Sequence, residues 1–338
     1  MIMFLPSTFM LKKEMCNPFT HSDHCSGQLF KSHFLVYLWV FIGFSGVPHV
    51  KYYYVFLFFV YVVSVLGNTA VMAVIYLDHN LKTPKYVAVF NLAFVDLLGS
   101  TALVPKVLDI FLFNHYNVPY NECMMFLFFC NTCLSMQALN LVALSYDRLM
   151  AIMFPLHYQT KVTNRSMFSL ISFFWLFAII ITLIAVGLLT RYSFCKSVVI
   201  NSYFCDHGPI FRLACNDTFP SLVIAYMSFF LILWLPLVII FYLCIGYTLS
   251  KVASVQERLK AFKTCTAHLS VVSIYFLPTI VIFSIGPKIH QNARIISLSL
   301  ASVVPPMLNP IIYVLQTQEI KNSMKKAIER RKSNIMVK

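Results

Sequence analysis

Charged side chains are rare in the apolar part of this chain, and two of them lie side by side. Asp147 and Arg148 close a run of apolar and small residues in the stretch SYDRL. A charge deep in lipid costs about 2.5–3.5 kcal/mol on insertion scales, and at the end of a membrane span Arg148 can extend to water. Such a pair can act as a latch that, once broken, frees a cation to contact a carbonyl or a partner protein. A pair that only fixes orientation in the membrane would look the same.

Three further polar residues interrupt apolar stretches. Asn68 lies in LGNTA, Asp96 in NLAFVDLL, and Asn309 in PPMLNPIIY, where Pro310 follows it. Polar groups in hydrocarbon find partners or mark function, and a proline within a span frees a carbonyl and permits a bend. We expect Asn68, Asp96 and Asn309 to form one hydrogen-bonded cluster, with Pro310 as a hinge beside it.

The composition indicates the elements that position these residues. Of the 338 residues, 59% are hydrophobic and 11% are charged, against about 45–50% apolar and 25% charged in soluble domains. A membrane-spanning helix needs about 20 mainly apolar residues. Seven stretches qualify, of which the third is the least apolar: 54–77, 86–110, 123–147, 167–189, 221–249, 264–285 and 295–315. The sequence predicts an all-α membrane protein, a seven-transmembrane helix bundle.

The distribution of basic residues predicts the orientation. Sixteen of the 26 lysines and arginines fall in 78–85, 148–165, 250–263 and 316–338. Because basic residues concentrate on cytoplasmic loops, we expect an extracellular N-terminus and a cytoplasmic C-terminus. Three parts follow: an N-terminal extracellular segment (1–53), the bundle (54–315) and a cytoplasmic tail (316–338).

Both flanking parts carry an apolar pattern. Residues 34–44 resemble a short hydrophobic helix, too short to span, and we expect them to lie against the outer ends of the bundle. In the tail, Ile320, Met324 and Ile328 recur every four residues among lysines and arginines. This pattern predicts a short amphipathic helix on membrane lipid, although a solvated tail is the alternative. No basic cluster lies on a soluble domain, so nucleic acid is not an expected partner.

The ten cysteines divide between spans and outward-facing segments. Those in spans are most simply small buried residues: Cys130, Cys133, Cys244 and Cys265. An even number face an oxidising space, where disulfides form: Cys16, Cys25, Cys123, Cys195, Cys205 and Cys215. Their pairing does not follow from their number. No C-x-x-C pair occurs, so a zinc site is not expected, and nothing indicates another metal or a cofactor.

Together these motifs resemble the odorant receptors among the rhodopsin-like G-protein-coupled receptors. The resemblance covers about residues 43–330 and rests on segments in order along the chain: GN at 67–68, LKTPKY at 81–86, NLAFVDLL at 91–98, SYDRLMAI at 145–152, PLHY at 155–158, KAFKTCTAHL at 260–269 and PPMLNPIIY at 305–313. The segment at 260–269 is the most specific marker. RLKAFKTC and PPMLNPIIYVLQTQEIK look more like the branch associated with water-borne odorants.

The resemblance implies a conformational switch. Arg148 would separate from Asp147 on activation, helped by Tyr247 and Tyr313, with Asn309 and Pro310 as the hinge. A heterotrimeric G protein of the stimulatory olfactory type would then insert between the third, fifth and sixth spans.

The resemblance also implies covalent features outside the membrane. Cys123 would pair with Cys205, and Cys195 with Cys215, tying the long loop over the mouth of the bundle. Asn216 begins the sequon Asn-Asp-Thr in that loop and would be glycosylated.

In this family the odorant sits between the third, fifth, sixth and seventh spans, in their outer half. The corresponding residues here are Cys130, Asn131, Leu134, Ser135, Phe276, Thr279, Phe283, Ser299 and Ser302. Lys288 could pair with a carboxylate ligand, or it is a solvated loop lysine. Asn131 could instead make a helix-to-helix hydrogen bond. The lining would suit a medium-sized, partly apolar molecule.

The chain departs from the family pattern at two positions. Leu149 replaces the usual tyrosine after Asp-Arg, which bears on coupling strength. Gln137 replaces a glutamate in the third span, so a sodium site with Asp96 would be less anionic. The N-terminal segment is long and lacks an N-x-S/T sequon.

Other classes of membrane protein fit less well. No lysine occurs in 295–315, which excludes a retinal Schiff base, and intramembrane enzyme motifs are missing. A transporter would show repeats or several acids. The alternative is a rhodopsin-like receptor for a peptide or another small ligand, although no acid lies near the outer end of the third span as in amine receptors. We expect a plasma-membrane odorant receptor, not an enzyme.

Overall fold

A computed structural model describes residues 38–43, 49–194, 198–200, 202–211, 213–215, 234–250, 255–285 and 290–336. All of these belong to one compact unit, Phe34–Lys338. The cysteines at positions 16, 25 and 195, Asn216 and Lys288 lie outside the described residues, as do the side chains of Thr279 and Phe283.

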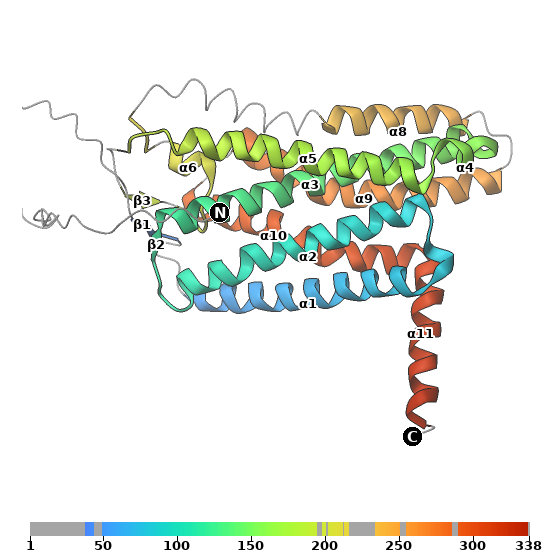
Figure 1. Ribbon diagram of the computed structural model, residues 1–338, viewed down its shortest axis with the longest axis horizontal. Coiled ribbons are helices and arrows are strands. Elements are labelled where there is room, and N and C mark those ends of the chain that lie inside the picture. The colour runs from blue at the N-terminus through green and yellow to red at the C-terminus, as the bar shows by residue number, and fades with distance from the viewer. Residues whose placement is uncertain are drawn as a thin grey trace, which may run out of the picture. The chain divides into compact units, whose positions relative to one another are not determined.

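Long helices run beside one another as a bundle (Figure 1). Within the described ranges they are α1 (Val50–Leu77), α2 (Pro84–Phe111), α3 (Tyr120–Met153), α5 (Asn164–Leu189), α8 (Trp234–Ser250), α9 (Val255–Ile285) and α10 (Gln291–Gln316). Helices α1, α2, α3, α5 and α10 are each long and apolar enough to cross a membrane, and α8 and α9 contain shorter apolar helices, 238–248 and 269–278. The predicted seven-transmembrane bundle is confirmed.

Helix α3 lies inside the bundle, which explains its modest hydropathy. It has the lowest mean hydropathy of the five long apolar helices, and its apolar part is the most buried of the five. Because its neighbours are other helices rather than lipid, its small and polar side chains can pack and form hydrogen bonds. Asn140 of α3, for example, accepts a hydrogen bond of 2.8 Å from Asn91 of α2.

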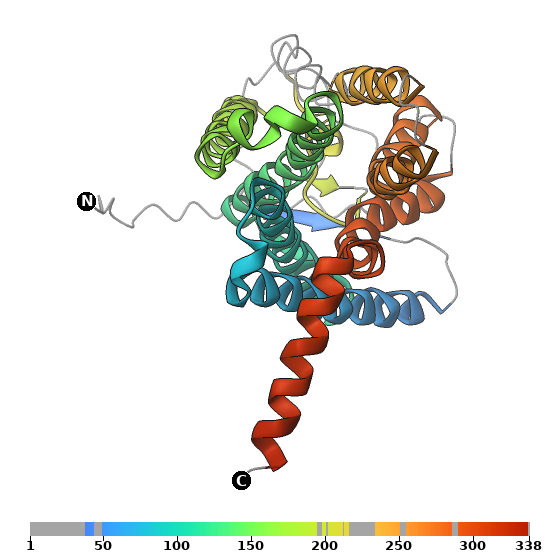
Figure 2. The same ribbon diagram turned by 90° about the vertical axis from the view of Figure 1, so that its right-hand side faces the viewer.

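Short elements connect the long helices. They are η1 (His79–Leu81), η2 (Pro155–His157), α4 (Tyr158–Lys161) and α6 (His207–Phe211). After Thr317 the chain turns away from α10 and forms α11 (Gln318–Met336), which projects across the end of the bundle (Figure 2). Ile320 of α11 is fully buried while Lys321, Lys325 and Lys326 are exposed. The predicted amphipathic C-terminal helix is therefore present.

A small sheet lies at the opposite end. Strand β1 (Leu38–Phe41) is its centre, antiparallel to β2 (Asn117–Pro119) and parallel to β3 (Val199–Ile200). The prediction of a short helix in this segment is wrong. Buried Trp39 and Phe41 alternate with exposed Leu38, as in a strand with one face on a core, and two distant loops supply the partners for its backbone groups.

Two large core clusters fill most of the described bundle, and a small third one joins Ile245 of α8 to Cys265 of α9. One contains Trp39 and Phe41 with the start of α3 and the residues around Cys205, so the apolar N-terminal segment does pack on the bundle as expected. The other contains the middle of α3 with Ile320 of α11. We call these regions the disulfide end, after the Cys123–Cys205 bond, and the α11 end.

Candidate functional site

A buried carboxylate joins three helices near the middle of the bundle. Asp96 of α2 is fully buried. Its Oδ1 accepts a hydrogen bond of 2.8 Å from Gln137 Nε2 of α3, and its Oδ2 accepts one of 2.8 Å from Asn309 Nδ2 of α10. Each carboxylate oxygen thus has a donor, as a polar group in a membrane requires. The expected contact between Asp96 and Asn309 is present.

The Asn68 side chain does not bond to Asp96 but donates to two backbone carbonyls. Its Nδ2 donates to the Ser64 carbonyl at 2.9 Å and to the Pro306 carbonyl of α10 at 2.9 Å. The Pro306 carbonyl lacks its usual helical partner because Pro310, four residues later, has no N–H. Asn68 therefore satisfies the carbonyl that the proline frees.

Gly67 makes this approach possible. A Cβ at position 67 would lie 3.0 Å from Pro310 Cβ and 3.1 Å from its Cγ, which is tight for carbon atoms. Gly67 and Asn68 of α1 thus both face the Pro306–Pro310 turn of α10, Gly67 against the Pro310 ring and Asn68 on the Pro306 carbonyl. The sequence showed both pairs but not that they meet.

The acid and base of SYDRL are in contact at the α11 end of α3. Arg148 Nη2 lies 2.5 Å from Asp147 Oδ2, with exposed side-chain fractions of 16% and 0%. Asp147 Oδ1 also accepts a 2.5 Å hydrogen bond from the hydroxyl of Tyr158, on α4. Sequence reasoning did not assign a role to Tyr158, although it belongs to the quoted PLHY segment.

The two tyrosines expected to help the switch differ in their surroundings. Tyr247 on α8 is 65% exposed. The Tyr313 hydroxyl on α10 is buried and has no hydrogen-bond partner among the described residues. A buried hydroxyl without a partner costs free energy, so this position of Tyr313 is less favourable than one in which its hydroxyl finds a partner.

Polar contacts attach α11 to the bundle. Glu319 Oε2 accepts a hydrogen bond of 2.9 Å from the Tyr86 hydroxyl and lies 3.6 Å from Lys85 Nζ. Ser323 Oγ donates to Asp78 Oδ2 at 2.5 Å. Partial burial raises the pKa of Glu319, but the Lys85 charge and the Tyr86 hydrogen bond outweigh burial and lower it overall. The Ser323 hydrogen bond lowers the pKa of Asp78.

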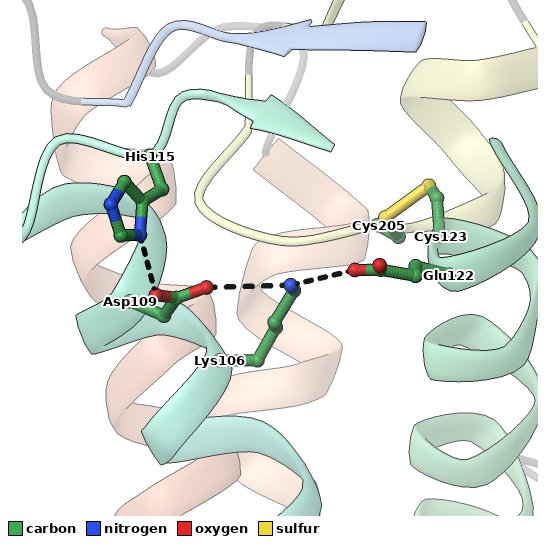
Figure 3. Close-up of polar contacts among 6 residues, drawn as sticks. All are labelled: Lys106, Asp109, His115, Glu122, Cys123 and Cys205. Atoms are coloured by element: carbon green, nitrogen blue, oxygen red, sulfur yellow. Dashed lines mark hydrogen bonds and ion pairs between the residues drawn. A yellow bond between two sulfur atoms is a disulfide. The ribbon is translucent and has the colours of Figure 1, made fainter. Parts of the chain in front are cut away.

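The disulfide end carries a chain of ionic contacts beside the Cys123–Cys205 bond (Figure 3). Lys106 Nζ lies 2.9 Å from Glu122 Oε2 and 3.4 Å from Asp109 Oδ2, and His115 Nδ1 lies 2.8 Å from Asp109 Oδ1. These contacts join the end of α2 to the start of α3. Exposed pairs of this kind contribute little stability individually, so they define local geometry beside the disulfide.

The second expected disulfide is only partly within the described residues. Cys215 is disulfide-bonded, its N–H donates to the Ser193 carbonyl at 2.9 Å, and Phe194 pairs with Ala214. Cys195, its expected partner, and the expected glycosylation site Asn216 are not described.

The residues expected to contact ligand come from α3, α9 and α10. Cys130, Ser135, Phe276 and Ser299 are buried, while Asn131, Leu134 and Ser302 are partly buried. The two serines already have partners: the Tyr53 hydroxyl contacts Ser299 Oγ, and the Tyr203 hydroxyl donates to Ser302 Oγ at 3.3 Å. Sequence reasoning missed both tyrosines because nothing in their local pattern indicates these distant contacts.

Comparison with solved structures supports the fold. Squid rhodopsin superposes with a TM-score of 0.68 over 85% of this chain and 87% of that chain, at 18% sequence identity. At this identity the likeness establishes the arrangement of the helices and not the ligand.

Comparison of sequences identifies the family. The family model described as olfactory receptor matches residues 57–331. Olfactory receptor 6C2 of Homo sapiens is 34% identical over 306 residues, which is 89% of this chain and 97% of that protein. Olfactory receptor 1E16 of Mus musculus is 35% identical over 287 residues, 84% of this chain and 91% of that protein. This chain, a multi-pass membrane protein with the rhodopsin-like fold, belongs to the olfactory receptor family.

Proposed function

We propose that this chain is a plasma-membrane odorant receptor that binds a small molecule between α3, α9 and α10 near the disulfide end. Binding there activates a heterotrimeric G protein of the stimulatory olfactory type at the α11 end. Family membership supports receptor action, and the chain is therefore a receptor and not an enzyme. The proposed location of the ligand is supported by the side chains there, which are buried and both polar and apolar, such as Cys130, Phe276 and Ser299.

The observation that carries the coupling part is the latch at Asp147 and Arg148. Arg148 is a mostly buried cation held by a fully buried carboxylate, and a second donor, Tyr158, holds that carboxylate. A charged pair so placed is kept at a cost in free energy, and its release would present Arg148 to a partner at the α11 end.

The buried polar network between the two ends supports a switch. Asp96 contacts both α3 and α10, and Asn309 and Pro310 lie in the same turn of α10. A proline there leaves α10 able to bend. A ligand bound at the disulfide end could thereby change the position of Tyr313, which follows Pro310 in α10. To move such an equilibrium from 1:99 to 99:1, a ligand must prefer the active state by about 5.5 kcal/mol.

The orientation in this proposal rests on charge. The α11 end carries the basic connections 78–85 and 148–165 and the exposed lysines of α11. Basic residues favour the cytoplasmic side and attract anionic lipid. The N-terminus and the disulfide end would then be extracellular, where disulfides persist.

The test is a cyclic AMP reporter in cells that express this chain with a stimulatory olfactory G protein. The odorant panel consists of acids, amino acids, aldehydes and steroids. We expect a dose-dependent response that Arg148→Ala abolishes while surface expression is retained. Arg165→Ala, a matched change at an exposed arginine of the same end, should leave the response intact. A full response in Arg148→Ala, or silence of the surface-expressed chain across the panel, would contradict this coupling.

A further inference from the structure

A tyrosine from the loop after α5 reaches into the region assigned above to the ligand. Tyr203 is 2% exposed and stands two residues before Cys205. Its hydroxyl donates to Ser302 Oγ of α10 at 3.3 Å. Ser302 in turn donates to the Leu298 carbonyl at 2.9 Å, so its hydroxyl proton is used and its oxygen is the acceptor for Tyr203.

The surroundings of Tyr203 include two of the expected ligand contacts, Cys130 and Ser302. Tyr203 belongs to the same cluster of buried residues as Cys130 of α3, and Tyr53 of α1 packs against that cluster. Its ring packs edge-on against Phe204 with centroids 4.5 Å apart, and Phe204 contacts Phe126 of α3 at 6.1 Å. Aromatic pairs at these distances attract one another. Tyr203 is therefore linked to α10 through Ser302 and to α3 through Phe204.

Two anchors hold this tyrosine in place. On its C-terminal side, Cys205 is bonded to Cys123 of α3. On its N-terminal side, β3 pairs with β1, where Ile42 N donates to the Ile200 carbonyl at 3.1 Å. Short tethers on both sides limit the positions of the side chain. Burial raises the pKa of Tyr203 well above its ordinary value, so the hydroxyl remains a donor at physiological pH.

We propose that Tyr203 is a specificity-determining residue, a tethered aromatic group that occupies part of the odorant site and is held there by its hydrogen bond to Ser302. Because it rests on the proposed function, the inference concerns which odorants fit. A small or flat compound binds beside the ring, whereas a bulkier compound has to displace the ring and break its hydrogen bond to Ser302. Bulkier compounds are excluded while the ring is in place.

The first test needs no signalling. Cys130 is 5% exposed and unpaired, so a small methanethiosulfonate reagent applied outside intact cells should label it slowly. Tyr203→Ala should speed the labelling of Cys130 several-fold by opening a path to it, whereas Tyr203→Phe, which keeps the ring, should not. Cys130→Ser in each background identifies the signal from this thiol. Tyr116→Ala, at a tyrosine of the same end that is 41% exposed, is the matched control. Equal labelling in wild type and Tyr203→Ala at equal surface expression would overturn the proposal.

The second test asks which odorants act, using straight-chain aldehydes from hexanal to decanal and the cyclic ketone carvone. We expect Tyr203→Ala to gain responses to the longer or bulkier compounds. Tyr203→Phe and Ser302→Ala each remove the hydrogen bond that holds the ring in place, so both should lower the half-maximal concentration of the bulkier compounds by about two- to tenfold, the range for one hydrogen bond. The double variant should shift no further. Additive shifts, or an unchanged odorant range in Tyr203→Ala, would contradict the proposal. If wild type gives no signal but the labelling result holds, the coupling proposal fails and the placement of Tyr203 stands.

Discussion

The Asn68 side chain of α1 donates a hydrogen bond of 2.9 Å to the Pro306 carbonyl of α10, 238 residues away in sequence. This contact gives a donor to the Pro306 carbonyl, which has no helical partner because Pro310 lacks an N–H. It makes a bend in α10 compatible with a membrane interior, because the freed carbonyl does not have to face lipid.

Removal of that donor should destabilise the bundle. We expect Asn68→Ala to lower the free energy of unfolding by about 1–3 kcal/mol, the cost of a buried acceptor left without a partner, measured by thermal unfolding in detergent. Asn164→Ala is the matched control, because Asn164 donates to the Lys82 carbonyl at 3.1 Å from an exposed position where water can replace it. Equal losses in the two variants would show that burial of this bond is not the cause.

The residue at position 137 should determine whether sodium ions stabilise the folded protein. Gln137 donates to Asp96, whereas Gln137→Glu would set two carboxyl groups against each other, and a cation between them would relieve their repulsion. We expect Gln137→Glu to unfold at a lower temperature than wild type in potassium chloride and to regain stability in sodium chloride. Gln137→Ala should lose stability without sodium dependence. An equal sodium effect on wild type would contradict this explanation.

Loss of the Tyr158 hydroxyl should raise signalling without ligand. Tyr158 donates to Asp147 at 2.5 Å and so fixes the carboxylate that holds Arg148. We expect Tyr158→Phe to increase basal cyclic AMP by about two- to tenfold, the equivalent of one hydrogen bond, normalised to surface expression. His157→Ala, at the exposed neighbouring position, should leave the basal level unchanged. A reduced basal level in Tyr158→Phe would mean that the tyrosine supports the active state.

Acid should loosen α11. The pKa of Asp78 is lowered in the folded protein, first by the Ser323 hydrogen bond, so its contribution is present above the ordinary carboxyl pKa of about 4 and is lost as pH falls through the lowered value. We expect spin labels on α1 and α11 to move apart below about pH 4. In Ser323→Ala the transition should begin at higher pH, because the pKa of Asp78 returns toward its ordinary value. An unchanged midpoint would show that Ser323 does not control it.

The polar core was largely predictable from sequence. In a membrane few groups can satisfy Asp96 and Asn309, so polar residues on neighbouring spans have little choice of partner. The prediction of a single cluster was incomplete for Asn68, whose partner is a carbonyl. The free carbonyl follows from Pro310, but which helix lies against it depends on the packing permitted by Gly67.

Strand β1 and Tyr203 were not predictable from local patterns. The alternation in LWVF is short, and whether it forms a strand depends on partners at 117–119 and 199–200, which no local periodicity reveals. The Tyr203 contact with Ser302 joins a loop to a helix 99 residues later. Long-range contacts of loop residues follow from the assembled bundle and leave no repeating signal.

The position of β1 at the centre of its sheet sets an order for assembly. Residues 38–41 are synthesised before either neighbouring strand, and β3 follows only after α1, α2, α3 and α5 have been made. Strand β1 is therefore synthesised first but lacks its full set of backbone partners until four helices have been made. The pairing of β1 with β3 is accordingly among the last steps in the assembly of the disulfide end.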